Sequence, residues 1–448
     1  MGFEEVYSRE VEAYKARTKR SLELYRRAVK VMPGGVCHNI RFFEPYPFYS
    51  TRGLGSRIWD ADGNEYVDMW MAHFSAILGH APREAVEAVR EAAEGSLHLG
   101  TVSELQVELA ELVCRAVPCA EEVRFTNTGT EAAMYAIRLA RAYTRRELVV
   151  KMEGGWHGGS DTLMKAVSYP FEQPESMGLL EQKLTTIPFN NLEEAERKLE
   201  ELKDRVAAII VEPLLAAGGA IPADREFLKL LKEESEKWGS LLVFDEVITG
   251  FRLAPGGGQE YYGLKPDLAV LGKILGGGAP IGAVCGLREV MELANPLGKE
   301  KWEKTWIGGG TFSANHLTMA AGLAVLRKLT SDPGIYRWIN SLGEEARAKV
   351  DSILEAHGVK ARTTGAASMM LTHFPKGDYE IRSARDCHEK ADKSLQKLYH
   401  LMLINRGVFF LPGHAGAFSA AHTGEDLEKL LQATEDAARH LKKAARQP

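Results

Sequence analysis

The middle of the chain alternates short apolar runs with amphipathic helical segments, and this alternation restricts the fold more than any other feature. The runs are rich in aliphatic and β-branched residues and are too short for helices. They predict strands at 123–126, 148–151, 207–211, 241–244, 268–271 and 281–285, with helices such as 130–143, 192–202 and 224–238 between them. Runs that are apolar throughout are typical of parallel strands buried on both faces. The sequence therefore predicts an α/β fold with a mainly parallel sheet covered by helices.

A smaller second domain is expected from the two ends of the chain. The first thirty residues have helical apolar spacing that stops at Pro33-Gly34-Gly35, and the alternating segment 59–68 predicts a hairpin. The later part predicts a long helix from about 315, strands at 367–372 and 408–411, and a closing helix from 424. The predicted division is a small α+β domain from 1–70 and 326–448 and a large domain from 71–325.

The composition limits the kinds of partner. A net charge of −5 over 448 residues gives no electrostatic case for binding nucleic acid or a membrane surface. The sequence shows no apolar signal segment and no apolar stretch of bilayer-spanning length. Its five cysteines are scattered and form no C-x-x-C pair, which is typical of reduced thiols. We expect a cytoplasmic protein that acts on small molecules.

A lysine among glycines and an aspartate behind an apolar strand carry the most specific chemical signal. Lys273 lies in Leu-Gly-Lys-Ile-Leu-Gly-Gly-Gly at 271–278, and Asp245 closes the run 241–244. A glycine-flanked lysine can approach a flat cofactor and form a Schiff base with its aldehyde. A carboxylate can keep the pyridine nitrogen of such a cofactor protonated, so the pair points to pyridoxal 5'-phosphate. Taken alone, the same residues also fit a surface lysine beside a helix-capping aspartate.

Other unusual residues follow predicted strands, where ligands gather in doubly wound sheets. Thr128, Gly129 and Thr130 open a helix, so their hydroxyls and N–H groups form a candidate phosphate cradle or simply cap the helix. Trp156 stands among the glycines at 154–159, where it either lies flat on a ring or is a buried aromatic in a turn.

The remaining polar motifs exclude several classes of protein. His157 suits a general base or a metal ligand, but no second histidine stands at ligand spacing, so no metal site is predicted. The Gly-Gly-Gly-Thr-Phe-Ser loop at 308–313 is a second candidate phosphate loop. The glycine clusters fit neither a P-loop nor a dinucleotide fingerprint, and no G-x-S-x-G elbow occurs. An ATPase, a nicotinamide-dependent dehydrogenase and a serine hydrolase are therefore poor fits.

The order of three motifs resembles class III aminotransferases of fold type I. The motifs are Val211-Glu212-Pro213, FDEVITGFR at 244–252, and Pro266-Asp267-Leu268 ahead of Gly272-Lys273. The resemblance runs from about residue 33 to the C-terminal helix. It implies that Lys273 holds pyridoxal phosphate and shuttles a proton, and that Asp245 pairs with the pyridine nitrogen.

The same resemblance implies roles for residues around the cofactor. Val247 would pack under the ring, Trp156 would replace the usual stacking tyrosine, Thr128, Gly129 and Thr130 would hold the phosphate, and Glu212 and His157 would belong to the same site. Thr311 would reach the phosphate in the neighbouring subunit. A homodimer with its active site at the subunit interface is therefore expected.

Within class III, several stretches resemble glutamate-1-semialdehyde 2,1-aminomutase. These are Pro-Gly-Gly-Val at 33–36, Gly-Thr-Glu-Ala at 129–132, Gly-Lys-Ile-Leu-Gly-Gly-Gly at 272–278 and Thr-Met-Ala-Ala-Gly at 318–322. By this resemblance Arg41 would bind the substrate's carboxylate through its guanidinium fork, and the alternative is a surface arginine in a loop.

Other features differ from that subgroup. Ala72-His73 stands where it has Ser-Trp, and the loop 412–417 lacks its glutamate, so the substrate pocket would differ, with Phe42, Phe43, Phe74 and His414 as candidate lining. The region 42–48 and Ala217 resemble β-amino acid aminotransferases. Without a glutamate at Ala217, a dual-substrate arginine switch is not expected.

The sequence therefore predicts a pyridoxal-phosphate-dependent aminotransferase that moves an amino group from an amine or amino acid to a keto acid or aldehyde. The first alternative is the aminomutase, which transfers the amino group within one molecule. The second is an amino-acid racemase. A non-catalytic binding protein is disfavoured because the lysine and the aspartate are both present.

Overall fold

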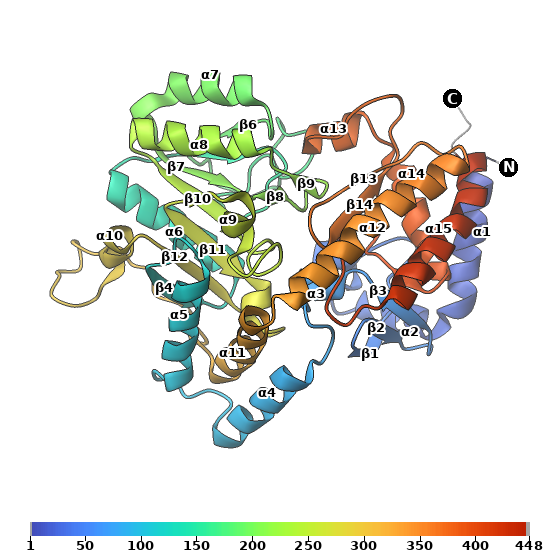
Figure 1. Ribbon diagram of the computed structural model, residues 1–448, viewed down its shortest axis with the longest axis horizontal. Coiled ribbons are helices and arrows are strands. Elements are labelled where there is room, and N and C mark those ends of the chain that lie inside the picture. The colour runs from blue at the N-terminus through green and yellow to red at the C-terminus, as the bar shows by residue number, and fades with distance from the viewer. Residues whose placement is uncertain (1, 445–448) are drawn as a thin grey trace.

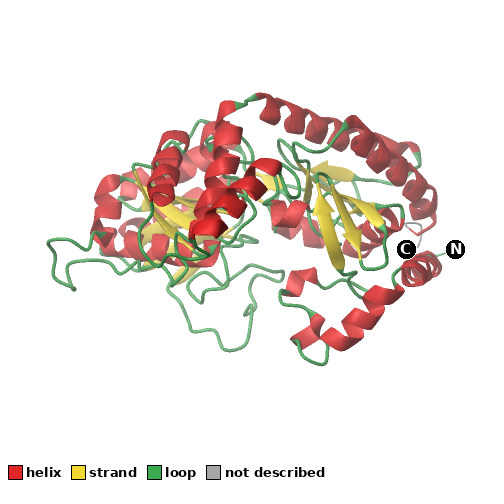
Figure 2. Ribbon diagram, turned by 90° about the horizontal axis from the view of Figure 1, so that it is seen from below, coloured by secondary structure: helices red, strands yellow, loops and turns green. Residues whose placement is uncertain are grey.

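The computed structural model describes residues 2–444 and places a large sheet with its helices beside a second group of small sheets and long helices (Figure 1). Seen from below, the strands form two groups, each with helices around it (Figure 2). The N- and C-terminal helices lie together in the second group (Figure 1). No helix in the described residues is long and apolar enough to cross a membrane.

The large sheet has seven strands in the order β4-β12-β11-β10-β7-β5-β6. Their bounds are β4 Glu122–Thr126, β5 Leu148–Met152, β6 Leu184–Ile187, β7 Val206–Val211, β10 Leu241–Glu246, β11 Leu268–Gly272 and β12 Gly282–Gly286. β12 runs antiparallel to β4 and β11, and the pairs among β11, β10, β7, β5 and β6 are parallel. The predicted mainly parallel sheet is confirmed.

Helices cover both faces of this sheet, which explains why its strands are apolar throughout. In β10, Val243 packs in a core cluster with residues of α6, while its neighbour Phe244 packs in another with residues of α7 and α8. The helices around the sheet are α4 Arg83–Gly95, α5 Glu104–Ala116, α6 Gly129–Thr144, α7 Leu192–Leu202, α8 Arg225–Trp238, α9 Gly257–Tyr262, α10 Arg288–Met291 and α11 His316–Ser331. Alternating side chains of one strand therefore serve two cores.

The second group joins the two ends of the chain. The predicted hairpin is present, and its second strand pairs in parallel with β15, as Val67 lies opposite Val408. The strands are β1 Ser50–Leu54, β2 Arg57–Asp60, β3 Glu65–Asp68, β13 Arg362–Thr364, β14 Met369–His373, β15 Val408–Phe409 and β16 Gly416–Ala417, with a separate pair β8 Leu214–Leu215 and β9 Ile221–Pro222. The helices are α1 Phe3–Arg17, α2 Lys19–Ala28, α12 Gly334–Ala356, α13 Ala384–Glu389, α14 Lys393–Asn405 and α15 Gly424–Ala444. The division at residues 70 and 325 stays a prediction.

The parallel strands place their polar residues at one edge of the sheet, where their carboxyl ends lie. Phe244 pairs with Val211 and Asp245 with Val270, so Glu212 after β7, Asp245 in β10 and Lys273 after β11 come together. The strand β10 ends at Glu246, two residues later than the predicted end at 244, so Asp245 belongs to the strand.

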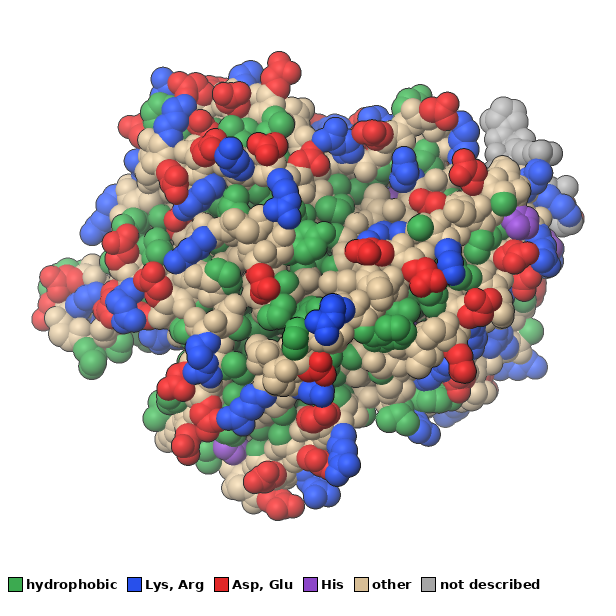
Figure 3. Space-filling model, in the orientation of Figure 1, with side chains coloured by type: hydrophobic (Ala, Val, Ile, Leu, Met, Phe, Trp, Pro, Cys, Tyr) green, Lys and Arg blue, Asp and Glu red, His purple; other side chains and the backbone are tan. Residues whose placement is uncertain are grey.

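The surface is of mixed charge. Charged side chains of both signs are interspersed over the face in Figure 3.

Candidate active site

A cavity of about 150 Å³ lies at this edge of the large sheet. It brings together all of the residues predicted to hold the cofactor except two: Gly129, Thr130, Trp156, His157, Glu212, Asp245, Val247 and Lys273 line it, and Thr128 and Thr311 do not. These residues come from the start of α6 and from the segments at the ends of β5, β7, β10 and β11. Ligand sites in such sheets form at this edge.

Lys273 contributes an amine to this cavity. It begins a 3-10 turn, Lys273–Gly276, and has a φ of 48°, a left-handed conformation that is uncommon for a residue with a side chain. Burial lowers the pKa of the Lys273 amine, and the negative charges of Asp245 and Glu212 oppose that shift. A lysine turned into a cavity beside two acids does not fit the alternative of a surface lysine in a loop.

Asp245 contacts His157, and both residues line the cavity. Its Oδ2 lies 2.8 Å from His157 Nδ1, and its Oδ1 accepts a hydrogen bond from the Val247 N–H at 3.0 Å. Burial lowers the pKa of His157, and the adjacent Asp245 opposes this. A neutral His157 donates from Nδ1 to the carboxylate, which leaves Nε2 as a buried atom without a hydrogen-bond partner among the described residues.

Glu212 is a second buried acid beside the first. Its Oε1 accepts from the Trp156 N–H at 2.9 Å, and its Oε2 accepts from the Ala216 N–H at 3.2 Å. Burial, and then the negative charge of Asp245, raise the pKa of Glu212 to about 8. This raised pKa favours a protonated Glu212 at neutral pH. Glu212 also fixes the backbone that carries Trp156, whose side chain is 37% exposed.

The first turn of α6 closes one side of the cavity. Thr128 caps the helix: its Oγ1 accepts from the Glu131 N–H at 3.1 Å, and the Glu131 carboxylate accepts from the Thr128 N–H at 3.0 Å. A Cβ on Gly129 would lie 2.8 Å from a methyl of Val247, and one on Gly158 would collide with Thr130. These glycines are required for close packing around the N–H groups of a helix start, which attract anions.

The residues present fit pyridoxal phosphate. One amine, one carboxylate held by two hydrogen bonds, an aromatic and a valine side chain, and a glycine-lined helix start share a single cavity. Asp245 and Lys273 would face the ring and its aldehyde, and the start of α6 would hold the phosphate. The individual roles of these residues stay predictions.

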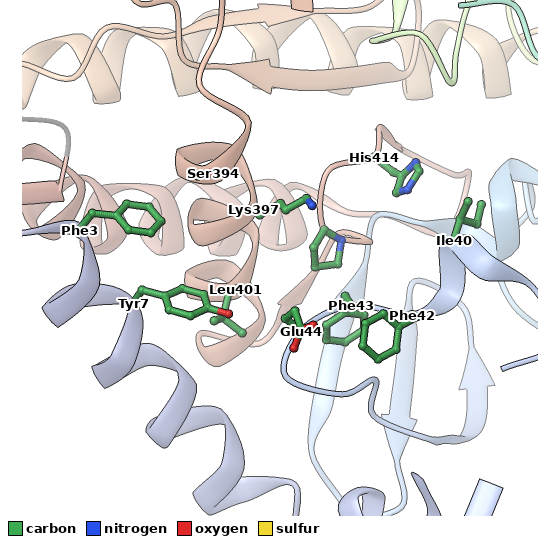
Figure 4. A pocket seen from close by; sticks show the side chains of 11 residues that line it. Phe3, Tyr7, Ile40, Phe42, Phe43, Glu44, Ser394, Lys397, Leu401 and His414 are labelled. Carbon is green, nitrogen blue, oxygen red and sulfur yellow. The ribbon is translucent and has the colours of Figure 1, made fainter. Parts of the chain in front are cut away.

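The predicted substrate residues lie outside this cavity. Arg41 is exposed, and its Nε donates to His73 Nε2 at 3.4 Å. His414, Phe42 and Phe43 line a second cavity of about 440 Å³ between α1, α14 and the segment after η2, Asn39–Arg41 (Figure 4). Phe74 is buried in the core against Trp70, and Thr311 is exposed in the loop before α11. Phe74 therefore lines neither of these two cavities.

Sequence reasoning missed Lys151, which is fully buried. Its amine donates to the carbonyls of Gly155 and Lys165, both at 2.7 Å, and of Leu163 at 3.2 Å. Burial lowers its pKa to about 8. A lysine inside an otherwise apolar predicted strand was the available signal. Its three bonds hold together the loop that presents Trp156 and His157.

Comparison with known proteins identifies the family. Residues 43–393 match the family model described as Aminotransferase class-III. A Methanopyrus kandleri protein named glutamate-1-semialdehyde 2,1-aminomutase is 42% identical over 95% of this chain and 98% of its own length. A protein of the same name from Methanothermobacter thermautotrophicus is 41% identical over 94% of this chain and 100% of its own length. The chain belongs to the class III aminotransferase family, as the motifs predicted.

Solved structures share the whole fold. An omega-transaminase from Sphaerobacter thermophilus is 35% identical, with a TM-score of 0.88 over 95% of this chain and 98% of that chain. A β-phenylalanine aminotransferase from Variovorax paradoxus is 31% identical, with a TM-score of 0.89 over 97% of each chain. These similarities confirm the predicted fold type.

Substituting Lys151 tests its role in positioning the loop. Lys151→Met is expected to lower the free energy of unfolding by ~2–4 kcal/mol, because three carbonyls lose their donor inside the core. It should also weaken the binding of pyridoxal phosphate. Chemical denaturation and cofactor titration measure the two effects. The control, Lys165→Met, removes an exposed side chain with a single 3.3 Å bond and should change little. Equal behaviour of the two variants would contradict the role of Lys151.

Glu212 gives the cofactor-free protein a pH-dependent stability. Its pKa rises from 4.5 to about 8 on folding, so the folded state binds a proton more tightly than the unfolded state. The stability that this contributes is complete at low pH and is lost as the pH rises to 8. Relative to Glu212→Gln, the wild type should lose up to about 1.4 kcal/mol per pH unit in this window. Urea unfolding at several pH values measures this, with the exposed Glu193→Gln as control. A constant difference between wild type and Glu212→Gln would refute the shift.

Proposed function

We propose that this protein uses pyridoxal phosphate to move an amino group within one substrate, from carbon 4 to carbon 5 of 4-amino-5-oxopentanoate. The observation that carries the proposal is the similarity to proteins named glutamate-1-semialdehyde 2,1-aminomutase, at 37–42% identity over 92–95% of the chain. These names favour the aminomutase, which the sequence placed second, over transfer between separate donors and acceptors.

Pyridoxal phosphate is the cofactor, and when bound it supplies an electron sink for the carbon that carries the amino group. In each half of the reaction the Lys273 amine would move one proton between the substrate carbon that carries the nitrogen and the carbon of the cofactor's aldehyde group. An amine must be neutral to accept a proton, and burial lowers the pKa of Lys273 in that direction. Asp245 would hold a proton on the pyridine nitrogen, and the hydrogen bond from His157 would keep its carboxylate oriented.

A specific observation favours a second candidate, transamination between two substrates. His73 stands where aminomutases carry tryptophan, the loop 412–417 has no acid, and the solved structures at 35% and 31% identity are named as transaminases. These differences fall around the substrate and not around the cofactor. The same cofactor residues would serve either reaction.

Incubation of the holoenzyme with 4-amino-5-oxopentanoate alone separates the two candidates. The proposal predicts 5-amino-4-oxopentanoate as the product, with no keto acid added. Product that forms from β-amino acids only when 2-oxoglutarate or pyruvate is supplied would instead establish transamination. No conversion in either assay would contradict both.

Two variants test the roles of Lys273 and Asp245 in that reaction. Lys273→Ala should abolish turnover, because no other amine lines the cavity among the described residues. Asp245→Asn should reduce kcat at least ~100-fold, because an amide cannot stabilise a protonated ring nitrogen. Circular dichroism checks that the variants fold. A near-normal rate in either variant would remove that residue from its role.

A homodimer is also proposed, supported by apolar side chains exposed around the predicted interface. Two loops meet there: Asn315 donates to the Leu97 carbonyl at 3.3 Å, and the rings of His98 and Phe312 lie 5.1 Å apart. The exposed side chains of these loops include Leu97, Val102, Trp302, Trp306 and Phe312. Exposed apolar side chains in the loops around Thr311 are typical of a subunit interface.

Sedimentation equilibrium tests this interface. The wild type should sediment as a dimer or a larger even assembly, and the Val102→Asp/Phe312→Asp double variant should sediment as a monomer. The control, Val31→Asp, replaces a side chain that is 81% exposed on the segment after α2 and should not change the mass. A monomeric wild type would contradict the proposal.

The cytoplasmic location that the sequence suggests stays a prediction.

A further inference from the structure

His73 lies in an unusual backbone turn beside the active-site lysine. Residues 71–74, none of them glycine, have φ values of 43°, 50°, 58° and 69°, all in the left-handed region. Such strain persists only where surrounding structure holds it, and it gathers at functional sites. Here the fully buried Arg252 holds the turn: its Nη2 donates to the Phe74 carbonyl at 2.8 Å, and its Nη1 donates to the Phe418 carbonyl at 3.1 Å.

The His73 ring is clamped and kept neutral. The Trp70 ring lies 4.5 Å from it and the His38 ring 5.5 Å from it. Burial, followed by the positive charges of Arg41 and other basic groups including Lys273, lowers the pKa of His73 to about 3. A neutral ring offers one nitrogen as an acceptor, and Nε2 accepts from Arg41 Nε at 3.4 Å.

Arg41 is a cation that forms no ion pair with any of the described residues. Its side chain donates one hydrogen bond to them, from Nε to His73. With Nε engaged, the two terminal nitrogens are left to form a fork for a carboxylate. The groups that act electrostatically on His73 are all basic: Arg41, His38, Lys273 and His414. A substrate carboxylate is suited to this environment.

We propose that His73 is a positioning residue that fixes the Arg41 guanidinium beside Lys273, so that the enzyme selects amines that carry a carboxylate. The inference rests on the proposed function and deepens it, because it assigns substrate selection to a residue at which this chain differs from the aminomutases. His73 accepts a hydrogen bond and takes no proton from the substrate.

Two amines that differ only by the carboxylate test this role: 5-amino-4-oxopentanoate and 1-aminobutan-2-one. Each is titrated into the holoenzyme, and the change in visible absorption of the cofactor gives the half-saturating concentration. The wild type should bind the acid at least about tenfold more tightly than the amine without it. His73→Phe, which keeps a flat ring but has no acceptor, should weaken binding of the acid about tenfold and leave the other amine unchanged. His73→Gln, which restores an acceptor, should stay within about threefold of the wild type.

Arg41→Gln provides a second route, because Arg41 is exposed and its loss should not prevent folding. It should cause the same selective loss, and adding His73→Phe should weaken binding of the acid no further. An equal loss for both amines in His73→Phe, additive losses in the double variant, or a wild type without preference for the acid would overturn the inference. A wild type whose absorption responds to neither amine would instead overturn the proposed function.

Discussion

The site depends on two carboxyl groups and one amine buried around a single cavity. Asp245 and Glu212 are each only 4% exposed, and isolated charges of this kind are costly to bury. The structure offsets this cost with backbone donors, with the His157 ring and with the proton that Glu212 retains up to about pH 8. The Lys273 amine faces these acids, and burial lowers its pKa toward the neutral form that can accept a proton.

The parallel sheet places these groups around one cavity. The strand order puts the ends of β7, β10 and β11 side by side, so three residues far apart in the sequence share one cavity. Arg252 then links this region to the C-terminal part, since it bonds both Phe74 and Phe418. The strained turn that carries His73 is held through this link. The residues proposed to hold the cofactor and those proposed to select the substrate thus lie on different parts of the fold.

Much of this architecture could be predicted from the sequence because it follows local rules. The strand 241–244 with Asp245, the glycine-flanked Lys273 and the capping Thr128 each have a local signature, and the structure brings Asp245 and Lys273 together. Non-local features had no such signature. The pairing of β3 with β15 joins segments about 340 residues apart, and a left-handed turn without glycine cannot be read from residue preferences. Phe74 looked like pocket lining because it is aromatic, yet it is buried against Trp70.

The central claim is that Lys273 holds the cofactor. It needs a direct test because Lys151 is a second buried lysine, and it lies close to the loop that presents Trp156. Borohydride reduction of the holoenzyme fixes pyridoxal phosphate to the amine that carries it, and peptide mass spectrometry then locates the label. We expect one pyridoxal phosphate label, on the peptide that contains Lys273, and none on Lys151. A label on Lys151 or on a surface lysine, with Lys273 unmodified, would contradict it.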